Sequence, residues 1–239
     1  MSNIRSRAES VQKIKKLVVL AVFCALAYVA MIVTAWIKVM FLTFDAKDTV
    51  ITVAGLLFGP VASLVISFTV AFIEFITVGD TGVYGFIMNF LSSAVFSVTC
   101  AMIYKYKKNM KGAVIGLVSA SLAMTAFMLL FNLFITPLYM GVAVGEVAKM
   151  IPTLFLPFNL TKGILNAALV LVIYKPVSTA LKSAKLLPRN SLDVPDDGLT
   201  AGERRKKNLL FSLVVTFIGL AVAAICVTVF FVFLGAMPA

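Results

Sequence analysis

Long uncharged stretches alternate with short polar segments along this chain of 239 residues. A membrane-spanning helix needs about 20 consecutive, mostly apolar residues. Several stretches meet that requirement, beginning with residues 17–37, which contain no charged side chain. The pattern predicts six helices over about residues 14–35, 46–58, 60–78, 83–104, 112–136 and 153–181, and a seventh after residue 208. The expected fold is therefore an all-α integral membrane protein.

The apolar stretch 49–78 has two interpretations, because Gly59-Pro60 interrupts it near the middle. It is either one kinked helix or two helices joined by a tight turn. A single crossing would put the basic residues at 105–111 on the opposite side of the membrane from the other basic segments. Two helices put all of them on one side, so we favour a turn at Gly59-Pro60.

Basic residues are strongly clustered in the chain. Seventeen of the 21 Lys and Arg residues fall into three groups: Arg5, Arg7, Lys13, Lys15 and Lys16; Lys105, Lys107, Lys108 and Lys111; and Lys175, Lys182, Lys185, Arg189, Arg204, Arg205, Lys206 and Lys207. Positive charge is retained on the cytoplasmic side of a membrane. This predicts a cytoplasmic N-terminus and, after a seventh helix, an extracellular C-terminus.

Three segments are expected. Residues 1–183 form a six-helix membrane domain that binds the substrate. Residues 184–208 form a polar cytoplasmic linker that contains Pro188, Pro195 and several aspartates, and residues 209–236 form an additional transmembrane helix. The first helix is expected to be retained, because no small-residue cleavage pattern follows it.

Composition narrows the function. The chain is 62% hydrophobic, with a mean hydropathy of +1.07 and a net charge of +11. We attribute that charge to segments beside anionic lipid headgroups and not to nucleic-acid binding. Histidine is absent, the three cysteines are isolated, and no glycine-rich phosphate loop is present. We therefore expect no enzymatic activity, no catalytic residues, no metal site and no cofactor.

Polar residues inside the predicted helices indicate a ligand site. Glu74 and Lys162 are ionisable groups within apolar stretches, where such groups are costly. Asn159, Lys162 and Asn166 share one helical face, and these residues map to the outer half of the membrane together with Asn89, Asn132, Asp45 and Asp48. Any single asparagine could instead join two helices by hydrogen bonding. Their convergence favours a small-molecule pocket that opens outward.

The same segments carry a family resemblance. They include Thr43-Phe44-Asp45-Ala46-Lys47-Asp48, Phe58-Gly59-Pro60, Gly79-Asp80, Asn89-Phe90, Asn132, Pro137-Leu138-Tyr139 and Pro157-Phe158-Asn159-Leu160-Thr161-Lys162-Gly163. Over about residues 10–183 the chain resembles the riboflavin-binding substrate-specific (S) components of energy-coupling-factor (ECF) vitamin transporters.

The resemblance implies a six-helix S-component bundle in the bacterial plasma membrane, binding riboflavin from outside with high affinity. Its partners would be a transmembrane coupling subunit and two ATPase subunits, which would hydrolyse the ATP. The expected substrate-binding residues are Leu42, Phe44, Asp45, Asn89, Asn132, Phe158, Asn159, Lys162 and Asn166. Asn89 and Asn132 would read the polar edge of the isoalloxazine ring, and Asp45, Asn159 and Lys162 would contact the ribityl hydroxyls. Ala21 and Ala25 match the small-residue face with which the family docks its coupling subunit.

Some alternatives remain open. An S component for thiamine or folate is the nearest, followed by a stand-alone secondary transporter, for which only Glu74 is a credible coupling acid. FMN is a further candidate ligand, because Lys38, Lys47 or Lys149 could tolerate a phosphate. The seventh helix departs from the six-helix pattern, and Glu74 matches no family position.

Overall fold

The computed structural model describes residues 2–40, 42–79, 81–184, 186–187, 221 and 228. The order of its elements is α1 (Ser2–Thr34), β1 (Lys38–Val39), β2 (Leu42–Thr43), α2 (Lys47–Phe58), α3 (Pro60–Thr77), α4 (Gly82–Tyr106), α5 (Met110–Met140), α6 (Val144–Met150), the π-helical segment η1 (Ile151–Phe155) and α7 (Leu156–Ser183). The expected linker and the expected seventh helix both lie almost entirely outside the described residues.

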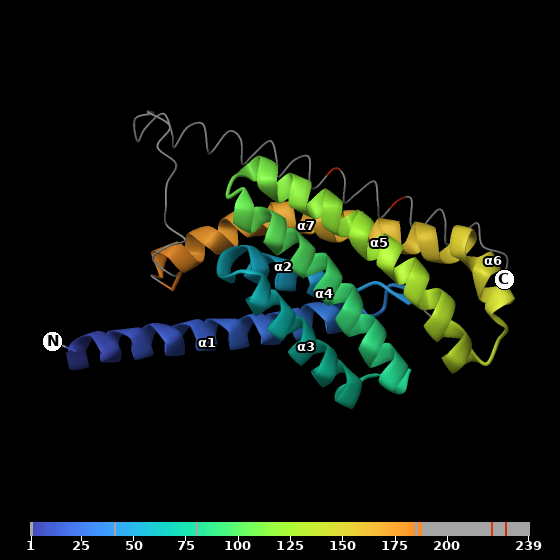
Figure 1. Ribbon diagram of the computed structural model, residues 1–239, viewed down its shortest axis with the longest axis horizontal. Helices are drawn as coiled ribbons and strands as arrows, with labels where there is room; N and C mark the ends of the chain where they lie inside the picture. The colour runs from blue at the N-terminus through green and yellow to red at the C-terminus, as the bar shows by residue number, and fades with distance from the viewer. Residues whose placement is uncertain are drawn as a thin grey trace.

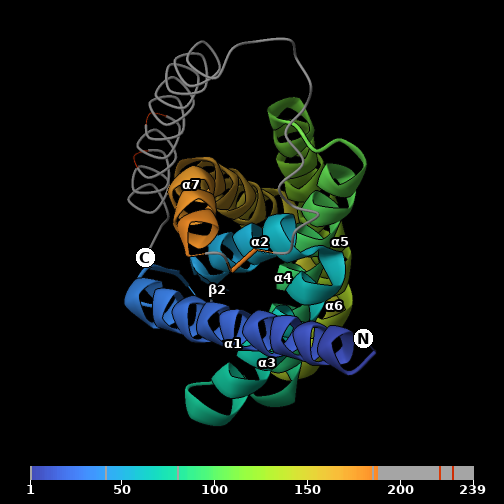
Figure 2. The same cartoon turned by 90° about the vertical axis from the view of Figure 1, so that its left-hand side faces the viewer.

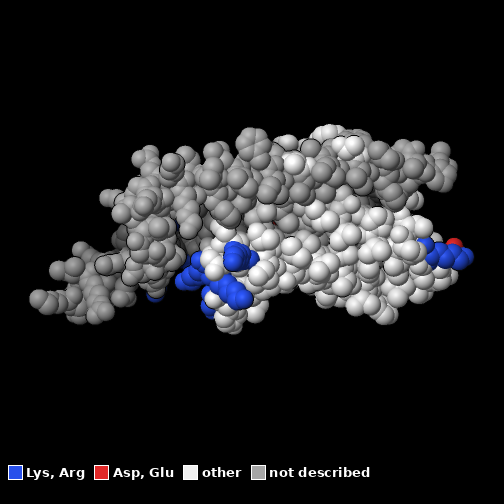
Figure 3. All heavy atoms as spheres, turned by 90° about the horizontal axis from the view of Figure 1, so that it is seen from above, with Lys and Arg blue, Asp and Glu red and all other residues white. Residues whose placement is uncertain are grey.

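The described helices form an elongated bundle (Figure 1). Among the described residues, five helical segments are long and apolar enough to cross a membrane: Ser10–Thr34, Pro60–Thr77, Gly82–Tyr106, Met110–Met140 and Val144–Ser183. The start of α1, the turn from α4 to α5 and the end of α7 lie at the same end of the bundle. The described basic residues of these segments therefore lie towards the same end of the bundle. On the described part of the surface in Figure 3, one group of charged side chains lies beside the grey region and another at the opposite end, with uncharged surface between them, as a membrane-spanning protein requires.

The short helix α2 occupies the centre of the bundle (Figure 2). It packs against α1, α3, α4 and α7, and its residues from Lys47 to Leu57 are buried apart from Val50, which is half-buried. The turn after α2 confirms the two-helix interpretation of residues 49–78. Gly59 has φ of 96°, which disfavours other residues, and Pro60 opens α3 at the first helical position.

A small β-hairpin connects α1 to α2. Lys38 pairs with Thr43 and Val39 with Leu42 in antiparallel register, an element that the sequence did not predict. Neither Asp45 nor Asp48 caps α2. The N-cap residue is Ala46, without a side-chain hydrogen bond, because both carboxylates are engaged by lysines.

Two predicted helix boundaries, the start of α1 and the end of α5, differ from the structure. Helix α1 begins at Ser2 and not near residue 14, so it includes the basic N-terminal segment. Helix α5 continues past Pro137 to Met140, since a proline in the last turn removes only one hydrogen bond, and Gly141 with φ of 68° ends the helix.

The segment 138–151, which lies between the helices predicted over 112–136 and 153–181, is mostly helical. It contains the end of α5 and the whole of α6, and then runs through η1 into α7 without interruption. Within α6, Glu146 and Lys149 form an ion pair one turn apart, which supports a short helix. Glycines and prolines near this segment led the sequence pattern to favour a loop.

Candidate functional site

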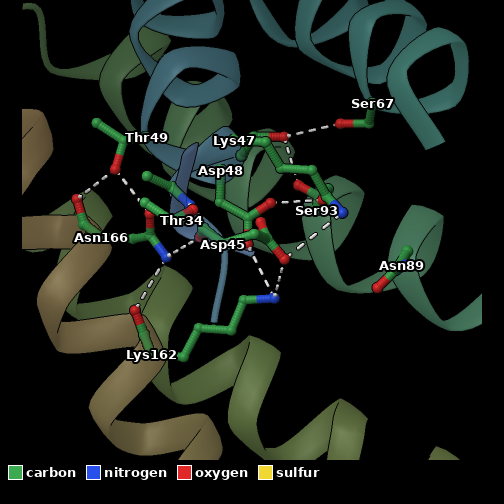
Figure 4. A network of polar contacts seen from close by, with 12 residues as sticks. Thr34, Asp45, Lys47, Asp48, Thr49, Ser67, Asn89, Ser93, Lys162 and Asn166 are labelled. Atoms are coloured by element: carbon green, nitrogen blue, oxygen red, sulfur yellow. Dashed lines mark hydrogen bonds and ion pairs between the residues drawn. The ribbon is translucent and has the colours of Figure 1, made fainter. Parts of the chain in front are cut away.

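A network of buried charges lies where the β-hairpin meets α2, α3 and α7 (Figure 4). Asp45 stands between two lysines: its Oδ2 atom is 3.2 Å from Lys162 Nζ and 3.5 Å from Lys47 Nζ. All three residues are at least 95% buried. Burial opposes ionisation of Asp45, but the ammonium groups of Lys162 and Lys47 outweigh burial and hold the pKa of this loop carboxyl below its usual value.

Glu74 of α3 extends the network to α4. One carboxylate oxygen lies 2.6 Å from Lys47 Nζ, and the other accepts a hydrogen bond of 2.7 Å from the Nδ2 atom of Asn89. Lys47 is 1% exposed, so its charge depends on these acidic partners. Glu74 thereby links a buried lysine of α2 to an asparagine of α4.

Asp48 and Asn166 complete the network. Asp48 lies 3.5 Å from Lys162 and accepts a short hydrogen bond from Ser93 of α4. Asn166 donates to the backbone carbonyl of Asp45 at 3.3 Å and accepts from the Thr49 hydroxyl at 2.6 Å. These bonds fasten α7 to the loop that carries Asp45.

A cavity of about 620 Å³ lies beside this network, at the end of the bundle opposite the basic clusters. Its volume is within the usual range for small-molecule sites, about 300–1,000 Å³. The lining comes from α1, the β-hairpin, the facing ends of α3 and α4, the end of α5 and the start of α7: Met31, Ala35, Lys38, Met40, Leu42, Thr43, Asp45, Glu74, Val78, Gly79, Thr81, Tyr84, Gly85, Met88, Asn89, Ser92, Met128, Asn132, Tyr139, Phe158, Asn159 and Lys162.

Seven of the nine residues expected to bind substrate line this cavity: Leu42, Asp45, Asn89, Asn132, Phe158, Asn159 and Lys162. Phe44 and Asn166 are buried but do not line it. Among the lysines considered for a phosphate, Lys38 lies at the cavity, Lys47 is buried in the network, and Lys149 is exposed in its pair with Glu146.

The cavity asparagines have defined amide orientations. Asn132 Nδ2 donates to the carbonyl of Met128 at 2.7 Å, and Asn159 Nδ2 donates to that of Phe155 at 2.8 Å. Carbonyl and carboxylate oxygens only accept hydrogen bonds, so the atom facing them must be the amide nitrogen. The amide oxygens of the two asparagines are left to accept hydrogen bonds from other donors. Asn132 Oδ1 accepts one of 3.0 Å from the Thr136 hydroxyl.

Two residues that line the cavity carry a buried side-chain oxygen without a hydrogen-bond partner among the described residues: Asp45 Oδ1 and Ser92 Oγ. A buried polar atom without a partner costs about 1–3 kcal/mol. Both atoms belong to residues of the cavity wall, so a small side-chain rotation would be needed to offer them to a polar ligand.

Sequence reasoning missed part of this site. Lys47, Asp48 and Ser92 were absent from the expected set, and Glu74 was left without a role. Lys47 and Asp48 fall in the first turn of the helix predicted over about residues 46–58. The available signal was charge balance, because Glu74 and Lys162 each need an opposite charge inside the membrane.

Comparison with known proteins identifies the family. Residues 15–174 match the family model described as "ECF transporter, substrate-specific component". The chain belongs to this family. It is 29% identical over 185 residues to the riboflavin transporter RibU of Staphylococcus aureus, a match that covers 74% of this chain and 97% of the relative. It is 27% identical over 188 residues to the riboflavin transporter FmnP of Bacillus subtilis, covering 73% and 99% of the two chains.

A solved structure agrees with the fold. The S component of a bacterial ECF transporter is 28% identical to this chain and superposes with a TM-score of 0.61, covering 71% of this chain and 99% of the other. The S-component fold therefore holds for the described bundle. On helix α1 of the present chain, Ala21 and Ala25 are exposed one helical turn apart, whereas Phe23 and Ala27 face the core.

Proposed function

We propose that this chain is the riboflavin-binding S component of an ECF-type vitamin uptake transporter. The observation that carries the proposal is the cavity of about 620 Å³, in which seven residues expected from the resemblance lie together. The two relatives named as riboflavin transporters support the choice of ligand over thiamine or folate. FMN is the phosphorylated flavin that Lys38 could accommodate at the cavity wall.

The chemistry of the lining suits an amphipathic ligand with a flat ring and a hydroxylated tail. Leu42, Met88 and Phe158 supply apolar surface for the ring. Asn89 and Asn132 would read its polar edge. Asp45, Asn159 and Lys162 would bind the ribityl hydroxyls, and Asp45 Oδ1 is an acceptor still without a partner among the described residues.

Two of the expected residues would act indirectly. Asn166 is 1% exposed and holds the Asp45 carbonyl and Thr49 in place. Phe44 is buried beside Asp45 in the loop. We propose that both position the Asp45 loop and make no direct contact with the ligand.

The cavity would open to the outside of the plasma membrane, because the basic clusters lie at the opposite end and positive charge stays cytoplasmic. The N-terminus would then be cytoplasmic. Delivery inward would require a transmembrane coupling subunit and two ATPase subunits. Ala21 and Ala25 are the proposed contact with the coupling subunit, since small residues allow close helix approach.

An absorption spectrum of the purified, detergent-solubilised protein tests this function. The protein is incubated with riboflavin, freed of unbound ligand and compared with a sample given thiamine followed by riboflavin. Retention of about one equivalent of flavin, undiminished by excess thiamine, is the expected result. A protein that retains no flavin would contradict the assignment and leave the family membership intact.

A further inference from the structure

The two carboxylate oxygens of Glu74 contact side chains that belong to two different helices, α2 and α4. Lys47 Nζ is 2.6 Å from Oε2, and Asn89 Nδ2 is 2.7 Å from Oε1. Glu74 and Asn89 both line the cavity, and Lys47 lies behind them at 1% exposure. The chain of contacts therefore runs from a buried cation to the cavity wall.

The chemistry of these groups allows only one orientation of the Asn89 amide. An ionised carboxylate accepts hydrogen bonds and cannot donate one, so the Asn89 atom that faces Glu74 must be the amide nitrogen. Asn89 Oδ1 accepts no hydrogen bond from the described residues. The oxygen is thus the polar atom of Asn89 that remains available to a ligand.

We infer that Glu74 is a specificity-determining positioning residue: it fixes Asn89 as a hydrogen-bond acceptor at the cavity wall and thereby selects ligands that carry a donor there. This inference rests on the proposed riboflavin site. The polar edge of an isoalloxazine ring carries two carbonyl oxygens and a single donor, the imide N–H between them. Asn89 Oδ1 accepts the hydrogen bond from that N–H.

The substitution Glu74→Gln reverses this arrangement in a defined way. Lys47 carries only donors, so the amide oxygen of the new glutamine turns toward Lys47 and its amide nitrogen turns toward Asn89. Asn89 must then rotate to offer its oxygen to residue 74, and it presents its nitrogen to the ligand. A donor would face the imide donor, and binding would weaken.

A second substitution restores the original polarity. In the double variant Glu74→Gln/Asn89→Asp, the carboxylate at 89 accepts from the glutamine and still offers an acceptor to the cavity. The total charge of the pair is unchanged, because one acid is removed and one is added. Asn89→Asp alone places two carboxylates in contact and is expected to weaken binding.

Binding of riboflavin and of its N3-methyl derivative to the purified full-length protein tests the inference through flavin fluorescence. The wild type should prefer riboflavin by more than about tenfold, the size of one hydrogen bond left unmade in a buried site. Glu74→Gln and Asn89→Ala should each lose about tenfold in riboflavin affinity, and the preference over the N3-methyl ligand should shrink. The double variant should recover both. Glu146→Gln is the matched control, since it removes an exposed carboxylate of α6 away from the cavity.

Three outcomes are distinguishable. Recovery of affinity and preference in the double variant supports the inference, whereas a purely structural role for Glu74 would leave the ligand preference unchanged in Glu74→Gln. Wild-type binding of riboflavin together with an unaltered preference in Glu74→Gln would overturn the inference and leave the proposed function standing. A wild type that binds neither flavin would overturn both.

Discussion

Lys162 and Asp45 are 117 positions apart in the chain, yet their side chains form an ion pair of 3.2 Å inside the bundle. The pair joins α7 to the loop between the β-hairpin and α2. Both residues also line the cavity. The same contact therefore contributes to the stability of the bundle and to the shape of the candidate site.

Substitution of Lys162 tests this double role. Lys162→Ala leaves two buried carboxylates without this cation, so we expect the free energy of unfolding to fall by about 3–5 kcal/mol. Riboflavin affinity should fall at least about tenfold. Lys182→Ala, at an exposed position near the end of α7, should change neither quantity. Thermal unfolding and fluorescence titration measure both effects, and equal, negligible changes in the two variants would refute the site.

The ionisation of Asp45 should make stability depend on pH. Its pKa lies below 3.8 in the folded protein because Lys162 and Lys47 outweigh the effect of burial. The unfolded chain binds the proton more readily, so the contribution of Asp45 is complete above the unfolded-state pKa and is lost as the pH falls through the lower, folded-state pKa. The difference in unfolding temperature between wild type and Asp45→Asn should be constant from about pH 7 to pH 5 and shrink below about pH 4. A difference that is independent of pH down to that range would contradict the ion-pair assignment.

Asn159 and Asn166 lie on one face of α7 but should respond differently to substitution. Asn166→Ala removes the bonds to Thr49 and to the Asp45 backbone and should cost about 1–3 kcal/mol of stability. Asn159 lines the cavity, and among the described residues its side chain bonds only to the Phe155 carbonyl one turn earlier, so Asn159→Ala should mainly weaken riboflavin binding. Unfolding temperatures without ligand and dissociation constants separate the two effects. The assignment fails if Asn166→Ala weakens binding more than Asn159→Ala without any loss of stability.

The exposed small residues of α1 predict a defect that appears only in the assembled transporter. Ala21→Leu or Ala25→Leu should leave riboflavin binding by the isolated protein unchanged, since neither residue lines the cavity. ATP-driven uptake with the coupling and ATPase subunits should fall severely, because a larger side chain separates two closely packed helices. Val22→Leu is the control, because Val22 is also exposed on α1 but does not belong to the pair of small residues. Normal uptake with Ala21→Leu and Ala25→Leu would refute the proposed docking face.

The sequence predicted the features that repeat along the chain or depend on composition. Uncharged stretches and basic clusters predicted the helices, the turn at Gly59 and the grouping of basic residues at one end. The contacts of Lys47 and Glu74 could not be predicted, because they join residues of α2, α3 and α4 whose relative rotation depends on packing. The β-hairpin was missed because its strands contain two residues each, too few for an alternating pattern.

The short central helix has a consequence for how the protein enters the membrane during synthesis. Helix α2 has 12 residues, or about 18 Å of length, against about 30 Å of hydrocarbon, and it begins with Lys47 and Asp48. Such a segment does not partition stably into lipid by itself, and in the finished bundle other helices enclose it. We therefore expect α2 to be inserted together with α3, as a hairpin that turns at Gly59. The buried charges of α2 would become tolerable only after α7 emerges from the ribosome and brings Lys162 to its partners.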